Sequence, residues 1–285
     1  MALSNFNMQS LGSFLQTAKY YIPDYQREYS WDKDVQVTDF WEDLVSLNND
    51  RINSDSSESH FFGQIVIQKE GEKYFLIDGQ QRITTSIIAL AAFRDVFGHL
   101  KDSVHGARYK YEDITTKYIG RYDESDDLDE LRFCLGQADE IFFKENIQIG
   151  APSATANTPA QKRIVASYRL FETKLEEAIA SADSDNDKYN VLKGLYDSLT
   201  NHFQIMSLTT DNINEAFIIF ETLNARGKEL ETSDLLKNFF FMQSSGSTLN
   251  MEQMKNRWVS MINTLIKKED ATKLIRYYWN ATHRY

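Results

Sequence analysis

The stretch Tyr74–Leu90, YFLIDGQQRITTSIIAL, changes character at its middle. Tyr74–Ile77 is a short apolar run typical of a strand, and Ile83–Leu90 carries apolar residues at helical spacing. The polar sequence DGQQR, Asp78–Arg82, lies between them and has almost nothing to bury. The pattern predicts a strand that leads directly into a helix through a joint of one acid, one glycine, two amides and one arginine.

This joint suits the binding of an anion. The first backbone N–H groups of a helix have no partners within it, and the helix dipole makes that end slightly positive. Gly79 allows a ligand to approach the backbone, and Arg82 offers a fork of donors that fits phosphate or carboxylate. Gln80 and Gln81 can add neutral hydrogen bonds, while Asp78 can orient Arg82 or hold a sugar hydroxyl or a metal. The alternative is a polar turn that binds nothing, with Arg82 paired to a nearby acid. The P-loop pattern is absent.

A second polar segment, Ile22–Trp31 with the sequence IPDYQREYSW, places three aromatic residues around Gln26–Glu28. A tyrosine beside an arginine can stack on a flat ring while the guanidinium meets an anion, which would use Tyr25 or Tyr29 together with Arg27. The alternative is a segment at the edge of the core whose aromatic rings are simply buried.

A third polar segment, Phe220–Asn238, has the sequence FETLNARGKELETSDLLKN. It predicts a helix that ends near Gly227, after Asn224 and Arg226. These two side chains can reach the anion site from the helical region. For this segment alone, ordinary placement of charge at a helix end is the favoured interpretation.

The remaining pattern predicts an α+β fold. A short helix is expected at Leu11–Gln16 and a short strand at Tyr20–Ile22, and Asp32 can cap a helix that runs to about Leu47. The sequences FFGQIVIQ and KYFLIDG form a hairpin, which the helix ending near Phe97 covers. Beyond residue 100 nearly every periodic segment is helical, including that of Cys134. We therefore expect an α+β unit at residues 1–100, which contains the candidate anion site, and a helical domain at residues 101–285.

Composition restricts the class of protein. The chain has 285 residues, of which 42% are hydrophobic and 13% aromatic, so it can build a large core. No apolar run reaches the roughly 20 residues of a membrane span. A single cysteine excludes an internal disulfide and suits a reducing compartment, so a cytoplasmic location is expected. The histidines lack metal-ligand spacing, and no H-N-H constellation of a nuclease is visible. The five histidines are His60, His99, His105, His202 and His283.

Charge is unevenly distributed along the chain. There are 42 acidic against 31 basic residues, a net charge of −11, which opposes non-specific binding of nucleic acid. If the chain contacts DNA, the basic C-terminal stretch Lys255–Tyr285 is the expected surface, or a partner supplies the rest. The candidate DNA-binding residues are Lys255, Arg257, Lys267, Lys268, Lys273 and Arg276.

The three polar segments and FFGQIVI, taken in this order, closely resemble the N-terminal domain family of GmrSD-type (type IV) restriction endonucleases, formerly a domain of unknown function. The resemblance extends from about Leu11 to the LIRYYWNATHRY end. It implies a unit similar to ParB and sulfiredoxin, followed by a mainly helical region. It also implies binding and hydrolysis of a nucleoside triphosphate with Mg²⁺, in an anti-phage system that acts on modified phage DNA. Cleavage would come from an HNH-type nuclease domain or subunit. Sulfiredoxins need a cysteine where this chain has glutamine, which argues against that activity.

Together, the residues and the resemblance predict a catalytic set of Asp78, Gln81 and Arg82. Asp78 would orient water, metal or Arg82, and Gln81 would position the attacking water, while Arg82 neutralises phosphate charge. The predicted nucleotide-binding residues are Tyr25, Gln26, Arg27, Tyr29, Gly79, Gln80, Thr84, Asn224 and Arg226.

Two rival functions stay open. In the first, the polar segments bind DNA or a modified base without catalysis. In the second, the chain is a helical scaffold that recruits a partner nuclease or toxin. The sequence specifies neither the base of the nucleotide nor the modification of the DNA. Its helical half offers surfaces for a homo-oligomer without identifying one.

Overall fold

The computed structural model describes residues 5–54, 58–122, 128–152 and 155–213, and then residues 215–216, 218–219, 240, 253–254, 256–258, 260–261, 264–265 and 270–282. In chain order the elements are β1 (Asn5–Ser10), α1 (Leu11–Thr17), β2 (Tyr20–Tyr21), η1 (Lys33–Val37), α2 (Thr38–Ser54), β3 (His60–Glu70), β4 (Lys73–Asp78), α3 (Gln80–His99), α4 (His105–Ile114), η2 (Thr115–Ile119), β5 (Gly120–Tyr122), β6 (Leu128–Leu131), β7 (Phe133–Cys134), α5 (Glu140–Phe143), η3 (Lys144–Gln148), α6 (Pro159–Ile179), α7 (Asp185–Asp197), η4 (Ser198–His202), β8 (Phe203–Thr210) and α11 (Asp270–Thr282), where η marks a short π-helical turn.

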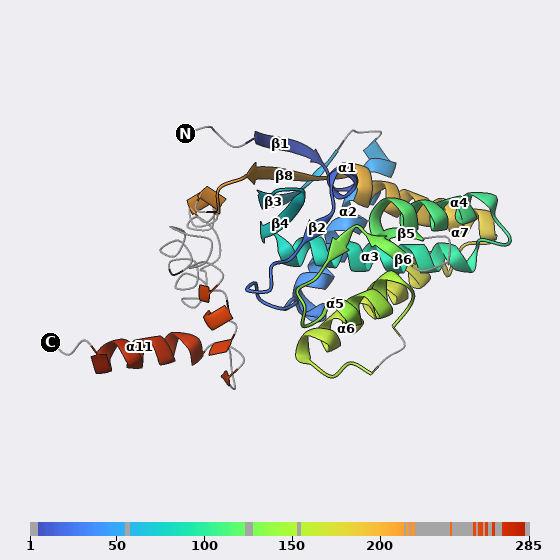
Figure 1. Cartoon of the computed structure of the whole chain (residues 1–285). Coiled ribbons are helices and arrows are strands. Elements are labelled where there is room, and N and C mark those ends of the chain that lie inside the picture. Colours follow the sequence, from blue (N-terminus) through green and yellow to red (C-terminus); the bar gives the residue numbers. More distant parts are fainter. Residues whose placement is uncertain are drawn as a thin grey trace.

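A mixed sheet with the strand order β1-β8-β3-β4-β2-β7 lies between the helices packed around α3 and the C-terminal helix α11 (Figure 1). The pairs β1–β8 and β3–β4 are antiparallel, whereas β8–β3, β4–β2 and β2–β7 are parallel. The predicted hairpin is therefore confirmed as β3–β4, and the α+β class is confirmed as well. The closer similarity to ParB and sulfiredoxin stays a prediction.

Helix α3 follows β4 after a single residue. Gly79 has a φ of 85°, a left-handed conformation that glycine adopts without strain, so the chain turns sharply from strand to helix. The helix begins at Gln80 rather than at Ile83 as expected, because Gln80–Arg82 form its first turn. The expectation that this joint buries almost nothing is also wrong, since Gln80 and Gln81 are buried.

Both faces of the sheet are covered, as the alternation of side chains along a strand requires. On one face, Ile65 and Ile67 of β3 pack into a large core with α3 and the helices that flank it, among them α4 and α6 (Figure 1). On the other face, Val66 packs into a smaller core with Tyr25 and Trp258. Part of the C-terminal region therefore lies against the sheet.

The expected boundary at residue 100 runs through a shared core. Strand β8 lies inside the sheet between β1 and β3, and the large core contains residues from Leu11 to Ile205. Four strands beyond residue 100, β5–β8, were expected to be helix or loop. Cys134, expected in a helix, lies in β7 instead and is buried. The sheet thus needs both halves of the chain to form.

The helical predictions are otherwise close to the structure. Asp32 caps the turn η1, and its carboxylate accepts a hydrogen bond from the backbone N–H of Asp34. Helix α2 then continues to Ser54, beyond the expected end near Leu47. Helix α6 buries one face, whose apolar residues recur every three or four positions, namely Ile164, Tyr168, Phe171, Leu175 and Ile179.

Candidate anion-binding site

The first turn of α3 holds the segment of residues 22–31 through side-chain amides. The backbone N–H of Ser30 donates to Gln81 Oε1 at 2.8 Å, and Gln81 Nε2 donates to the carbonyl of Glu28 at 3.2 Å. Gln80 Nε2 donates to the carbonyl of Arg27 at 3.4 Å. Two polar segments that are about 50 residues apart in sequence thus meet at one corner of the molecule.

The side-chain amides of the glutamines in this corner form hydrogen bonds with backbone groups. Gln26 Nε2 donates to the carbonyl of Ile77 at 3.0 Å, so a side chain of the segment of residues 22–31 also bonds to the backbone of β4. Both ends of the Gln81 amide are engaged, so in this conformation the side chain positions residues 28–30 rather than a ligand. Its role in positioning water stays a prediction.

Arg82 is half-buried in the first turn of α3 and reaches back over β3. Its Nη1 donates to the carbonyl of Gln64 at 2.6 Å. A guanidinium carries five N–H donors, so this bond leaves most of them for a ligand. Within the described part of the chain, Arg82 forms no ion pair with an acid. The described residues therefore do not support the alternative in which a neighbouring carboxylate neutralises Arg82.

Two glycines let the backbone approach this guanidinium. Gly63 of β3 has a φ of 117°, and a Cβ built on it would lie 3.2 Å from Arg82 Cζ. A Cβ on Gly79 would overlap Ile65 Cδ1 and would lie 3.4 Å from Arg82 Nη1. A side chain at either position would occupy the space that the arginine and its surroundings use.

The start of α3 also has unused backbone donors. The first helical hydrogen bond runs from Ile83 N–H to the Gly79 carbonyl at 3.0 Å. The N–H groups of Gln80, Gln81 and Arg82 therefore have no carbonyl partner within the helix. Gln80 Oε1 is buried and has no hydrogen-bond partner among the described residues. Among the described residues, the corner thus combines a positively polarised helix end, N–H groups without a helical partner and one acceptor without a hydrogen bond.

Arg27 adds a second cation beside this helix end. Its carbonyl accepts the Gln80 bond, which fixes its backbone next to the first turn of α3. Its side chain is exposed and forms no ion pair with any described acid. The backbone of Arg27 therefore lies beside the helix end that carries Arg82.

The two tyrosines of the segment are buried on opposite faces of the sheet. Tyr29 lies in the large core, where its hydroxyl is 2.8 Å from Thr85 Oγ1 and 3.1 Å from Ser167 Oγ, and burial raises its pKa to about 12. Tyr25 lies in the smaller core, and burial raises its pKa further above the usual value. The core-packing interpretation therefore describes both rings in this structure, while stacking on a ligand stays a prediction.

The remaining predicted site residues have different surroundings. Thr84 is buried, and its hydroxyl donates to the carbonyl of Gln80 at 2.8 Å, one turn back in the helix. Asp78 is half-buried at the end of β4, where it pairs in register with Val66. Asn224 and Arg226 lie outside the described residues.

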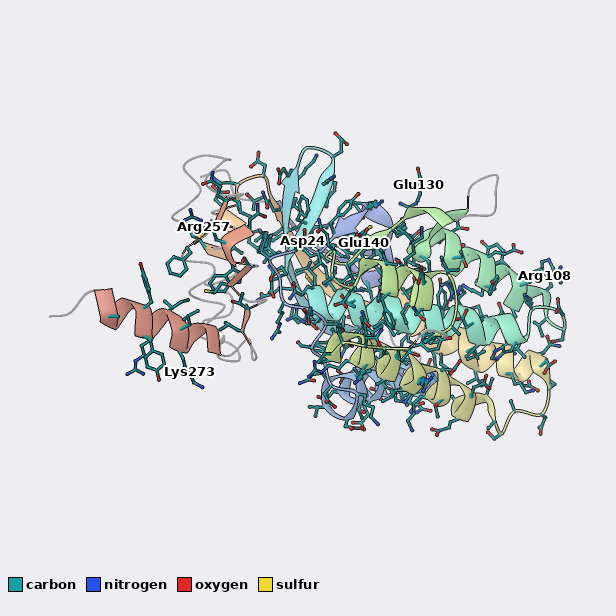
Figure 2. All side chains as sticks on the ribbon, turned by 60° about the horizontal axis from the view of Figure 1, so that its bottom comes forward. Asp24, Arg108, Glu130, Glu140, Arg257 and Lys273 are labelled. Atoms are coloured by element: carbon teal, nitrogen blue, oxygen red, sulfur yellow. The ribbon has the colours of Figure 1, made fainter. Side chains whose placement is uncertain are left out.

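Three candidate DNA-binding residues, Arg257, Lys273 and Arg276, are exposed. Figure 2 shows Arg257 and Lys273 in the C-terminal part at one end of the molecule, with Arg108 at the opposite end. The other three candidates, Lys255, Lys267 and Lys268, lie outside the described residues. The assignment of all six to DNA stays a prediction.

Histidines and acids do not gather into a metal site in the part of the chain that the structure describes. His60 pairs with Asp43 at 3.5 Å and His99 with Glu176 at 2.9 Å. Of the helices in the same part of the chain, none has both the length and the hydropathy to cross a membrane.

The sequence interpretation missed the contribution of β3 to the site. Gly63 and the Gln64 carbonyl contact Arg82, although FFGQIVI was interpreted only as a strand. A glycine inside a strand often marks a bulge or the close approach of another group, and that was the available signal.

The comparison with known families includes this whole corner. Residues 11–241 match the model described as the N-terminal domain of GmrSD restriction endonuclease. No curated protein matches the sequence. The match spans the segment of residues 22–31, β3, α3 and β8, and it covers well over half of the 285 residues. The chain therefore belongs to the family of the GmrSD restriction endonuclease N-terminal domain.

Proposed function

We propose that this chain binds and hydrolyses a nucleoside triphosphate at the amino end of α3 and thereby regulates a restriction system. The family places the protein in such a system, and nucleotide chemistry is our addition. In this proposal the system acts on modified phage DNA. Cleavage is supplied by an HNH-type nuclease domain or subunit.

The observation that carries the proposal is the set of groups that contact the Arg82 guanidinium. Its guanidinium is held by a backbone carbonyl and, among the described residues, by no carboxylate, so its charge is not cancelled. It lies at a helix end whose first N–H groups have no helical partners. Phosphate oxygens match both kinds of donor, because they accept charge-assisted hydrogen bonds in a bidentate way.

In this proposal some residues of the corner bind phosphate, and others hold the binding residues in position. Arg82 and the first-turn N–H groups neutralise phosphate charge, and Arg27 adds a second cation, which is much of what phosphoryl transfer requires of a protein. Gln80 and Gln81 hold residues 27–30, and with them Arg27, in place.

Asp78 would hold magnesium or orient the water at the end of β4. Its carboxylate oxygens are of the type that Mg²⁺ prefers, and its place directly before Gly79 puts it at the helix end. The ion, when bound, supplies charge neutralisation to the phosphates. Asn224 and Arg226 remain candidates to join the site.

A second candidate function is DNA binding without catalysis. It is favoured by α11, where Lys273 and Arg276 are exposed together with Tyr277 and Tyr278, whose exposed fractions are 69% and 67%. Basic and aromatic side chains of this kind can contact phosphates and stack on bases. The net charge of −11 opposes it.

Hydrolysis by the purified protein tests the proposal. Phosphate release from each ribonucleoside triphosphate is measured with magnesium, with and without DNA. We expect turnover in the wild type, loss of turnover in Arg82→Ala, and wild-type turnover in Arg169→Ala. Arg169 is a matched control, because it is exposed on α6 and forms no ion pair with described acids.

Two results would reject parts of the proposal. Unchanged turnover in Arg82→Ala removes Arg82 from the mechanism. DNA binding with a steep salt dependence, in a protein that binds no nucleotide, supports the second candidate function instead.

A further inference from the structure

Strand β3 changes register twice near the amino end of α3. Its pairing with β8 shifts between Phe61 and Gly63, and its pairing with β4 shifts between Val66 and Ile67. Such bulges bend a strand and re-aim its groups. Gly63 lies in this distorted part with a φ of 117°, a value that residues with a side chain rarely adopt.

The Arg82 side chain fills the space where a Gly63 side chain would stand. A Cβ built on Gly63 would lie 3.2 Å from Arg82 Cζ and 3.3 Å from both Nε and Nη1. Its three nearest atoms therefore all belong to this one guanidinium. These distances are shorter than ordinary carbon contacts, so an added methyl group would displace either the guanidinium or the strand.

The next residue supplies a fixed partner for the same guanidinium. The β3–β4 ladder ends at the pair of Val66 with Asp78, so Gln64 lies beyond the last residue of β4. A carbonyl past the end of a ladder needs another donor, and Arg82 Nη1 supplies it at 2.6 Å. The bulged strand thus determines where the guanidinium lies.

An arginine that is oriented before its ligand arrives loses less side-chain freedom on binding. We propose that Gly63 is a positioning residue for Arg82. Its missing side chain lets the guanidinium lie on β3, bonded to the Gln64 carbonyl, with its remaining donors ready for a multiply charged phosphate. This inference rests on the proposed function, because it concerns the same site.

Gly63→Ala tests the inference through nucleotide affinity. We expect the Kd for a nucleoside triphosphate to rise about tenfold in a calorimetric titration, since the ordering of one long side chain is lost. Gly71→Ala is the matched control: Gly71 also has a positive φ, 60°, but a Cβ there would meet nothing within 4 Å. An unchanged Kd in Gly63→Ala, or an equal rise in Gly71→Ala, would overturn the inference.

A thermal-unfolding cycle tests the contact without any nucleotide. The fall in Tm caused by Gly63→Ala is compared in the wild type and in Arg82→Ala. Because Arg82 supplies every atom nearest to the added Cβ, we expect the fall to be about 2–4 °C smaller in Arg82→Ala. Equal falls would overturn the inference.

The two measurements distinguish the possible failures. A wild-type protein that binds no triphosphate rejects the proposed function and this role with it, whereas coupled Tm values without a change in Kd reject only the role of Gly63. If Gly63→Ala fails to fold and the double variant folds, the steric contact is established. If neither folds, the backbone alone needs the glycine, and the inference fails.

Discussion

Two arginines of α3, Arg94 and Arg82, differ in their burial and in whether an acid pairs with them. Arg94 is 1% exposed, and its Nε and Nη2 donate to the two carboxylate oxygens of Asp95 at 2.7 and 2.9 Å. The same guanidinium donates to the carbonyls of Ile147 and Gln148 in η3. Arg82 is half-buried and has one carbonyl partner and no described acid.

The difference separates a structural arginine from a candidate binding residue. Arg94, Asp95 and the Tyr168 hydroxyl, which donates to Asp95 at 2.7 Å, form a network whose charges balance inside the protein. Such a network links α3, α6 and η3 and leaves nothing for a ligand. At the corner, Arg82 is oriented by a carbonyl and pairs with no acid among the described residues, so an anionic ligand could balance its charge.

The largest expected effect is on stability, at Arg94. Arg94→Leu leaves the Asp95 carboxylate without its buried partner, so we expect the free energy of unfolding to fall by about 3–5 kcal/mol. Urea denaturation measures this loss. Arg82→Ala should cost much less, and an equal loss in the two variants would erase the distinction between the two arginines.

The next effect is on ligand affinity, at Arg82. Removing a charged, oriented donor should weaken triphosphate binding by about 2–3 kcal/mol, or roughly 30–150-fold. Equilibrium dialysis measures the affinity, with Arg169→Ala as the control. Arg82→Lys should restore part of it, because lysine keeps the charge but lacks the planar fork. A variant Arg82→Ala that binds as well as the wild type would contradict the proposal.

A pH effect is expected from Tyr29, which belongs to the closed interior as Arg94 does. Burial raises its pKa from the usual 10.0 to about 12, so the folded state retains the proton more strongly than the unfolded state. The resulting stabilisation is fully present below pH 10 and is lost as the pH rises toward 12, by up to about 1.4 kcal/mol per pH unit. Unfolding of the wild type and of Tyr29→Phe is compared over this range. Parallel curves would show that Tyr29 does not contribute.

At neutral pH, Tyr29→Phe removes the hydroxyl that bridges Thr85 and Ser167. We expect a loss of about 1–2 kcal/mol in stability, because two hydrogen bonds are broken in the core. The Kd for triphosphate should not change. A weaker Kd with unchanged stability would instead support the prediction that Tyr29 stacks on the ligand.

The smallest effect is expected at Arg27, the exposed cation of the corner. Arg27→Ala should weaken binding by less than about 1 kcal/mol, and the difference should shrink at high salt because the charge is screened by solvent. Titrations at two salt concentrations measure it. A loss as large as that of Arg82→Ala would mean that Arg27, rather than Arg82, is the main anion ligand.

Much of the fold could be predicted from local periodicity. The hairpin, α3 and the buried face of α6 follow from period 2 or period 3.6 in the sequence. Strand β8 was missed because its order in the sheet depends on pairing with β1 and β3, which are far away in sequence. No local pattern near residue 205 indicates those partners. The same long-range pairing explains why the boundary at residue 100 does not divide the core.

The candidate site was predictable in part. The sequence indicates that DGQQR and YQREYS are polar segments, but not that Gln80 and Gln81 would be used to hold one against the other. It does not distinguish a tyrosine that faces a ligand from one that bonds to Ser167 on another helix. Nor does it show that the Gln64 carbonyl would lie beyond the end of β4, where Arg82 reaches it.

The most direct test of the account is a calorimetric titration of the wild type and of Arg82→Ala with each ribonucleoside triphosphate and magnesium. We expect saturable binding of at least one nucleotide to the wild type and a loss of most of that affinity in the variant. Equal binding curves for the two proteins, or no binding heat from the wild type with any of the four nucleotides, would contradict it.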